Sequence, residues 1–212
     1  MAIQRGKTEF LMGIDRVEQL DAWLRTHPDA RGVAFIGRSN VGKSSLINAV
    51  FGNQVARVSK TPGRTRQVNV FRFVWQPPQQ EPREFYLFDV PGYGHAEVSK
   101  AMSQNWDNLM NAFFNAISGK VLLIGLQDAR HPMQAADKDF LKWLRGFPLV
   151  TYLAINKTDK LKTQKERAAL KKAMVDVNPL ALGVGQIYYT SAETLDGVPQ
   201  LTEGMMNHLL QA

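Results

Sequence analysis

The chain has 212 residues, enough for one well-packed domain that buries roughly 70% of the surface of its unfolded chain. It contains no cysteine, which excludes disulfides and thiolate-bound metals, and no apolar run approaches the length of about 18 residues that a membrane-spanning helix needs. The N-terminus carries no apolar leader and the formal net charge is +7, so we expect a cytoplasmic monomer that binds polyanions.

The positive charge is unevenly distributed along the chain. Between Asp29 and Glu81 there is no acidic residue but there are eight basic ones. Residues 156–172 hold a second basic run, which is also typical of a solvated helix face. The first run spans a glycine-rich loop, and it therefore predicts affinity for nucleotide phosphates and, more broadly, for RNA.

Short apolar runs alternate with helical patterns, which predicts an α/β fold: a mostly parallel six-stranded sheet with one antiparallel strand and helices on both faces. Residues 1–30 are predicted to be an N-terminal extension packed on the domain, with an edge strand at 8–12 and a short helix at 18–23. Residues 31–212 are predicted to form the domain itself. Its predicted strands cover residues 33–36, 67–75, 83–88, 121–126, 149–155 and 186–189. Its predicted helices cover residues 43–51, 98–117, 135–145, 163–175 and 198–210.

A phosphate-binding pattern, GRSNVGKS, occupies residues 37–44 between a predicted strand and a predicted helix, the context that such a loop requires. Its glycines permit a tight turn in which backbone N–H groups converge on phosphate oxygens, and the helix N-terminus favours the same anion. Lys43 can contact the β- and γ-phosphates, and the Ser44 hydroxyl can bind Mg²⁺. The predicted loop residues are Gly37, Arg38, Ser39, Asn40, Val41, Gly42, Lys43, Ser44 and Ser45.

The tetrapeptide NKTD at residues 156–159 follows a predicted buried strand and predicts guanine as the base. Asp159 can accept hydrogen bonds from guanine N1–H and N2–H₂, whereas adenine has no donor at N1. Asn156 can bond the base edge and tie this loop to the phosphate loop, while the Lys157 stem can cover the base plane. The backbone of a later turn can donate to guanine O6; its predicted contacts are Thr190, Ser191 and Ala192.

Two further loops are predicted to surround the reacting phosphate. In DVPGYG, residues 89–94, Asp89 is expected to reach Mg²⁺ through a water and the Gly92 N–H to contact the γ-phosphate. In TPGRTR, residues 61–66, a threonine should bind the same Mg²⁺. We prefer Thr65, because it lies two residues before a predicted strand, with Thr61 as the alternative; the loop is expected to reorder when the γ-phosphate leaves. The remaining predicted contacts are Gly63, Arg64, Val90 and Pro91.

With these motifs in this order, the chain resembles the translation-factor-class small GTPases and, more specifically, the EngB-type (YihA/YsxC-like) bacterial GTPases. The resemblance rests on GRSNVGKSSLIN, TPGRT and above all DVPGYG, and it covers the chain from about residue 8 to the end. It implies a P-loop GTPase domain that binds GTP or GDP with Mg²⁺ and contacts rRNA and ribosomal proteins of the large ribosomal subunit or its assembly intermediates. Two departures are Asn156, where the family commonly has Thr, and His95, where an aromatic residue is expected.

Tyr93 stands where signalling GTPases place a glutamine that orients water. A phenol with a pKa near 10 is a poor base at neutral pH, so we expect slow intrinsic hydrolysis. One substitute is K⁺ bound by the Asn40 side chain, as in similar GTPases with Asn at this place; alternatively Asn40 is only a turn residue. A second is His95, and a third is a residue of the partner. The residues expected to support hydrolysis are Lys43, Thr65, Gly92 and Asn40.

Two other functions remain open at this stage. A metabolic P-loop enzyme such as a nucleotide kinase would leave the NKTD segment without a role. A GTP-dependent switch for a membrane or cell-division partner, acting in septation without RNA, would show no salt-sensitive binding to RNA or ribosomes.

Overall fold

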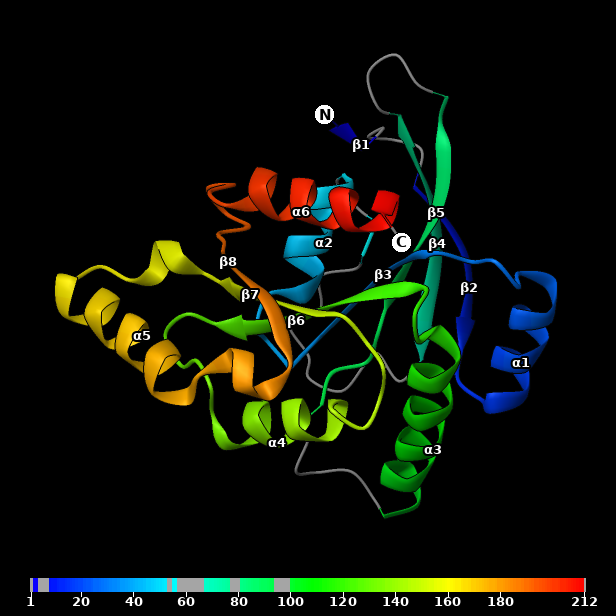
Figure 1. The fold of residues 1–212 in the computed structure, drawn as a ribbon, viewed down its shortest axis with the longest axis horizontal. Helices are drawn as coiled ribbons and strands as arrows, with labels where there is room; N and C mark the ends of the chain where they lie inside the picture. Colours follow the sequence, from blue (N-terminus) through cyan, green and yellow to red (C-terminus); the bar gives the residue numbers. More distant parts are fainter. Residues whose placement is uncertain are drawn as a thin grey trace.

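A computed structural model of the chain describes residues 2–3, 8–52, 55–56, 67–76, 81–93 and 100–211 (Figure 1). Its strands are β1 (Ala2–Ile3), β2 (Glu9–Ile14), β3 (Gly32–Gly37), β4 (Val68–Gln76), β5 (Arg83–Asp89), β6 (Val121–Asp128), β7 (Thr151–Asn156) and β8 (Val184–Tyr189). Its α-helices are α1 (Val17–Thr26), α2 (Lys43–Phe51), α3 (Lys100–Ile117), α4 (Ala135–Leu144), α5 (Gln164–Val177) and α6 (Val198–Gln211). Two short 3₁₀ helices are η1 (Thr158–Lys160) and η2 (Pro179–Leu182).

The strands form one mixed sheet in the order β1-β4-β5-β3-β6-β7-β8, with β2 also pairing with β4. Strand β3 pairs in parallel with β5 and β6, and β7 pairs in parallel with β6 and β8. Strand β4 runs antiparallel to β5, as the proline-containing connection between them predicts. The predicted fold class, a mostly parallel sheet with one antiparallel strand in the domain, is therefore confirmed.

The sheet has eight strands among the described residues rather than the six predicted, because the N-terminal segment adds two. Both β1 and β2 pair antiparallel with β4, so they extend the sheet beyond the predicted set. Strand β2 matches the predicted edge strand, and Phe10 packs edge-on against Phe71 of β4. The two-residue β1 is too short to leave an alternating pattern, which is why the sequence does not reveal it.

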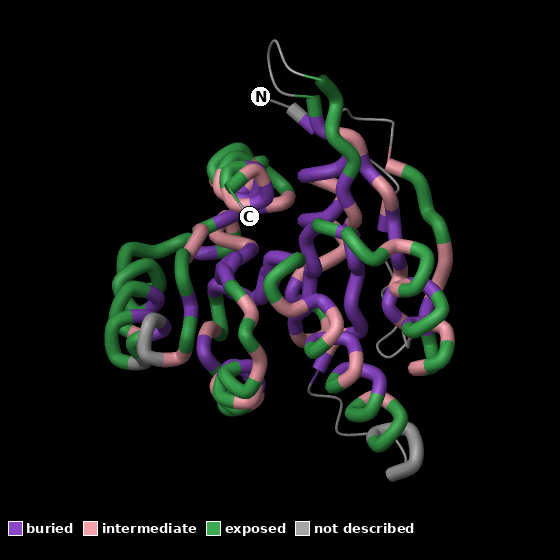
Figure 2. Tube along the Cα trace, turned by 45° about the vertical axis from the view of Figure 1, so that its right-hand side comes forward, coloured by how far each residue is buried: buried purple, intermediate pink, exposed green. Residues whose placement is uncertain are grey.

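Helices cover both faces of the sheet. Helices α2 and α6 pack together on one face, where their buried side chains meet those of the central strands. Helices α1, α3, α4 and α5 bury their apolar sides against the other face. Figure 2 shows the result: buried strands in the middle and exposed outer helix surfaces. None of the helices in the described part of the chain combines the length and apolar character needed to cross a membrane.

The carboxyl ends of neighbouring parallel strands meet at one edge of the sheet, which is where such sheets bind ligands. Asp89 of β5 lies in register with Phe35 of β3, two residues before β3 ends at Gly37. On the other side of β3, Asp128 at the end of β6 is paired with Asn156 at the end of β7. Polar residues that are far apart in sequence are thereby brought to a single edge.

Candidate nucleotide-binding site

The loop between β3 and α2 has the backbone of a phosphate-binding turn. Asn40 has a φ of 65° and Gly42 a φ of 92°, so both lie in the left-handed region, and α2 begins directly afterwards at Lys43. A Cβ on Gly42 would lie 2.5 Å from Nδ2 of Asn156. Glycine is therefore required at position 42 both by its φ and by the side chain packed against it.

The segment that follows β5 lies directly against this phosphate loop. A Cβ on Gly92 would lie 2.6 Å from the Gly37 carbonyl oxygen, and a Cβ on Gly37 would lie 2.8 Å from the carbonyl oxygen of Leu126. Side chains are excluded at both positions because backbone atoms occupy that space. The predicted neighbours of the γ-phosphate, Gly92 and the loop 37–44, are thus in contact.

Lys43 and Asp89 form an ion pair between Nζ and Oδ1. Asp89 is buried at the end of β5 and Lys43 is largely covered at the start of α2. Ser44 and Ser45 are partly exposed in the first turn of the same helix. Of the residues that the sequence predicts for phosphate and metal binding, Lys43 and Asp89 are therefore in contact, and Ser44 adjoins Lys43 in the chain.

Asn156 connects three segments of the site. Its side chain is 1% exposed, and Nδ2 donates to the Val41 carbonyl oxygen of the phosphate loop at 3.1 Å. Its Oδ1 accepts from the Ala192 backbone N–H at 3.2 Å and from the Thr190 hydroxyl at 3.4 Å. Asn156 thus makes the tie to the phosphate loop that the sequence predicts. The N–H of Ala192, one of the residues predicted to contact guanine O6, donates to Asn156 in this structure.

Asp159 presents a carboxylate beside this junction. Its Oδ1 accepts from the Ser191 hydroxyl at 2.7 Å, and its Oδ2 is 2.9 Å from Nζ of Lys160. Burial raises the pKa of Asp159, but hydrogen bonds from Lys160 and Ser191 outweigh it and lower that pKa below the ordinary value. The carboxylate is therefore ionised at neutral pH and suited to accept two N–H groups of a base.

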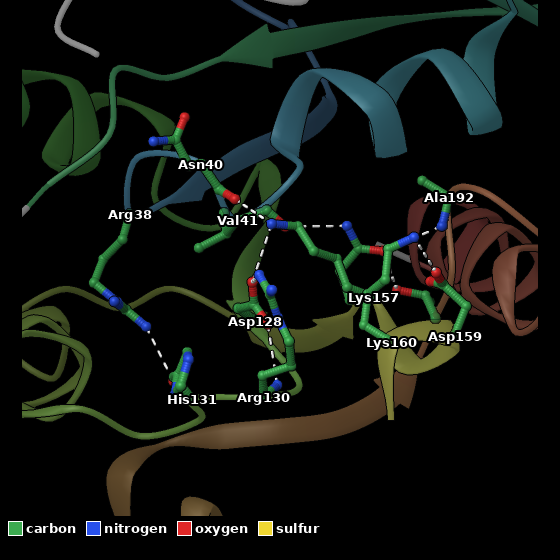
Figure 3. A network of polar contacts seen from close by, with 12 residues as sticks. Arg38, Asn40, Val41, Asp128, Arg130, His131, Lys157, Asp159, Lys160 and Ala192 are labelled. Atoms are coloured by element: carbon green, nitrogen blue, oxygen red, sulfur yellow. Dashed lines mark hydrogen bonds and ion pairs between the residues drawn. The ribbon is translucent and has the colours of Figure 1, made fainter. Parts of the chain in front are cut away.

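A second carboxylate, Asp128, lies at the end of β6 and was missed by the sequence analysis (Figure 3). It accepts from Arg130 Nη2 at 2.6 Å and from Lys157 Nζ at 3.0 Å, while Lys157 also donates to the Asn40 carbonyl oxygen. Burial raises the pKa of Asp128, but the hydrogen bonds from Arg130 and Lys157 lower it well below its usual range. Lys157 is thus held across the phosphate loop. The available signal of the role of Asp128 was its place at the end of a strand that neighbours the strand ending at Asn156.

Tyr93 faces helix α4. It is 9% exposed, its hydroxyl donates to Asp137 Oδ1 at 2.9 Å, and its ring stacks on Phe140 at 4.1 Å between centroids. Arg38, predicted as a phosphate-loop contact, also reaches this helix: its Nε donates to Asp137 at 2.8 Å. The role of Asp137 was not predicted from the sequence. Its position three and four residues before Phe140 and Leu141, on the same apolar side of the helix, was a signal of a buried polar contact.

Several predicted site residues lie outside the residues that the structure describes. They are Thr61, Gly63, Arg64, Thr65 and His95. The choice between Thr61 and Thr65 as a metal ligand and the role of His95 therefore stay predictions.

The fold and the site define a class of protein. One edge of a mostly parallel sheet carries a phosphate loop, an acidic loop after β5 and an Asn-Lys-x-Asp segment after β7. These are the parts of a P-loop GTP-binding domain.

The sequence profile of a family described as 50S ribosome-binding GTPase matches residues 32–157. The probable GTP-binding protein EngB of Petrotoga mobilis is 34% identical over 200 residues, which cover 92% of each chain. That of Aquifex aeolicus is 36% identical over 181 residues, covering 85% of this chain and 92% of its own.

Solved structures show the same fold. A crystal structure of a probable GTP-binding protein EngB has a TM-score of 0.59 and 22% identity, covering 85% of this chain and 100% of the other. A variant of Era from Aquifex aeolicus, bound to GDP.AlF4-, has a TM-score of 0.66 and 22% identity, covering 84% of this chain and 56% of the other. The chain therefore belongs to the EngB family of ribosome-binding GTPases.

Proposed function

We propose that this protein is a GTP-hydrolysing switch with a low intrinsic rate that serves assembly of the large ribosomal subunit. The observation that supports it best is the junction at Asn156, which joins the predicted base-binding residues to the phosphate loop. Beside it, the ionised Asp159 carboxylate can accept the N1–H and N2–H₂ groups of guanine. This arrangement would serve to select the base. A nucleotide kinase would instead need a site for the molecule that accepts the phosphoryl group.

At the phosphate end, Lys43 would contact the β- and γ-phosphates, and the backbone N–H groups of residues 37–44 would bind their oxygens. Ser44 and Asp89 fit Mg²⁺ because a hydroxyl and a carboxylate are the hard oxygen ligands that this ion prefers, and both residues adjoin Lys43, Ser44 in the chain and Asp89 through its ion pair. When bound there, Mg²⁺ would neutralise phosphate charge. Since Lys43 and Asp89 pair with each other in this structure, both must exchange partners when the nucleotide binds.

Slow intrinsic hydrolysis follows from the orientation of Tyr93. Its hydroxyl is engaged by Asp137 and its ring by Phe140, so it does not serve to orient water. Burial and the nearby Asp137 charge raise the pKa of Tyr93 well above its ordinary value, which removes it as a base as well. Another group must therefore stabilise the transition state.

Asn40 is our candidate for that group, acting by binding K⁺. Its side-chain amide points away from the network around Lys157 (Figure 3). Hydrolysis should be about tenfold faster in K⁺ than in Na⁺, and Asn40→Ala should abolish the difference. Asn111→Ala, on the exposed side of α3, is the matched control and should keep it. Equal wild-type rates in both salts would rule out the cation.

Binding to ribosomal subunits tests the proposed function. The protein is loaded with a non-hydrolysable GTP analogue or with GDP and sedimented with purified subunits across a salt series. We expect binding to the large subunit in the GTP-like state only, weakening as salt rises because basic residues neutralise phosphates. No sedimentation in either state at low salt would refute the ribosomal role and favour a non-ribosomal partner such as the division machinery.

A further inference from the structure

We propose that Asp137 is a shared anchor that holds Arg38 of the phosphate loop and Tyr93 of the loop after β5 to helix α4. In this arrangement Tyr93 is a positioning residue that keeps Gly92 at the γ-phosphate. The inference rests on the proposed GTP switch and goes beyond it, because it identifies how the two loops at the phosphate are coupled to each other and to a helix outside the site.

Asp137 is fully buried and hydrogen-bonded by three donors. Its exposed fraction is 0%. Its Oδ1 accepts from Arg38 Nε at 2.8 Å and from the Tyr93 hydroxyl at 2.9 Å, and its Oδ2 accepts from the Gln134 backbone N–H at 2.9 Å. A buried carboxylate is costly unless it is paired and hydrogen-bonded, so the loss of any of these donors is strongly opposed. Each donor comes from a different segment, and the carboxylate fixes the three segments together.

The Tyr93 end of the anchor controls the position of Gly92. The ring is held by stacking on Phe140, with an interplanar angle of 11°, and the hydroxyl is held by Asp137. Gly92 is the adjacent residue, and its missing Cβ would lie 2.6 Å from the Gly37 carbonyl oxygen. A peptide bond joins the two residues and fixes their Cα atoms about 3.8 Å apart. A displacement of Tyr93 therefore also moves Gly92 relative to the phosphate loop.

The Arg38 end attaches the phosphate loop to the same helix. Arg38 follows Gly37 directly, and besides Asp137 its guanidinium donates to Gln134 Oε1 at 2.6 Å and to the His131 carbonyl oxygen at 3.1 Å. Both loops that meet the γ-phosphate are therefore bonded to the first turn of α4. A nucleotide that moves Gly92 therefore also moves Tyr93 and strains these contacts. By reciprocity, a partner that binds α4 more tightly in one arrangement of these contacts changes the affinity for GTP relative to GDP.

The test compares the affinities of two nucleotides in variants of the anchor. Tyr93→Phe deletes the hydroxyl and keeps the ring on Phe140. Dissociation constants for GDP and for a non-hydrolysable GTP analogue are measured, together with kcat and KM for GTP. We expect the analogue to lose about three- to tenfold in affinity relative to GDP, as the loss of a hydrogen bond to a buried charge implies, and kcat to fall more than KM changes.

Tyr152→Phe is the matched control. Tyr152 is 8% exposed, against 9% for Tyr93, and its ring lies beside His208 of α6, on the other face of the sheet from α4. Tyr152→Phe also removes a hydroxyl, but it should leave the ratio of the affinities for the GTP analogue and GDP unchanged. Gln134→Ala is the second anchor variant, because it removes an acceptor of Arg38 from an exposed position without altering either loop. It should shift the ratio in the same direction by less.

A ratio within twofold of wild type in a folded Tyr93→Phe protein overturns the proposal, and so does an equal loss of affinity for both nucleotides. Thermal unfolding establishes that the variant is folded; if it is not, Gln134→Ala decides by the same ratio. Failure of the underlying GTP switch would look different, since the wild-type protein itself would then show no preference for guanine nucleotides.

Discussion

The two ends of the site differ in how their residues are held. At the base end, three segments are hydrogen-bonded to one another. At the phosphate end, an ion pair joins Lys43, which is proposed to bind phosphate, to Asp89, which is proposed to bind Mg²⁺. Asn156 bonds the phosphate loop and the 190–192 segment together, and Asp159 is bonded to Ser191. Lys43 and Asp89, by contrast, contact each other. Under the proposed function, Asn156 and Asp159 are already positioned by these bonds before the base binds, while Lys43 and Asp89 have to exchange partners when the phosphates bind.

The largest expected effect is at the phosphate end. Lys43→Ala removes the charge proposed to contact the β- and γ-phosphates and leaves the Asp89 carboxylate buried without its partner. We expect nucleotide affinity to fall about 100-fold or more, measured by calorimetry with GDP. Lys142→Ala, on the exposed surface of α4, is the control for loss of a positive charge. A fall below tenfold would show that Lys43 does not contact the phosphates.

Base selectivity should change next most strongly. Asp159→Asn exchanges an acceptor for a donor, so affinity for GDP should fall about 100-fold while xanthine nucleotides gain affinity. The hydrogen bond from Ser191 can be kept by the Asn oxygen, which limits the damage to the fold. Competition binding with guanine and xanthine nucleotides measures the change, and Asp139→Asn on α4 serves as control. Unchanged guanine preference would remove Asp159 from the base site.

The smallest effect concerns stability and pH. The lowered pKa of Asp128 means that its ion pairs with Arg130 and Lys157 stabilise the fold above the unfolded-state pKa of about 4. This contribution is lost as pH falls through the lower folded-state pKa. Asp128→Asn should therefore melt a few degrees below wild type at pH 7, and the gap should narrow below about pH 4.

Melting temperatures between about pH 7 and pH 3 test this sign, again with Asp139→Asn as control. A gap that stays constant or widens at low pH would contradict the role given to Asp128. The same measurement separates the two ends of the site. Among the residues that the structure describes, Asp128 bonds Lys157 at the base end, whereas Lys43 and Asp89 at the phosphate end pair with each other.

Local patterns predicted the parts of the molecule that local physics determines. The bounds of α2 follow from apolar residues at helical spacing and from Gly52 at its end, and the predicted and observed helices coincide. The phosphate loop was predictable because the turn itself requires Gly42 and the phosphate charge favours a lysine next to it. The antiparallel pairing of β4 and β5 followed from the short loop that joins them, in which prolines exclude a helix or an interior strand.

Contacts between distant segments were not predictable in this way. Asp137 lies 44 residues from Tyr93 and 99 from Arg38, and nothing in its neighbours announces either partner. Asp128 lies two residues beyond the predicted strand 121–126 and was given no role, since its role depends on Lys157 being folded back across the phosphate loop. Strand β1 exists only because β4 offers it an edge. In each case the tertiary fold, rather than the local sequence, selects the partner.

Hydrogen–deuterium exchange in the GDP-bound and GTP-analogue-bound states tests the central distinction between the two ends most directly. We expect protection to change at residues 89–93 and in the first turn of α4, while residues 156–159 and 190–192 keep the same protection in both states. Equal changes at both ends, or none at residues 89–93, would contradict a preformed base site coupled to a responsive phosphate site.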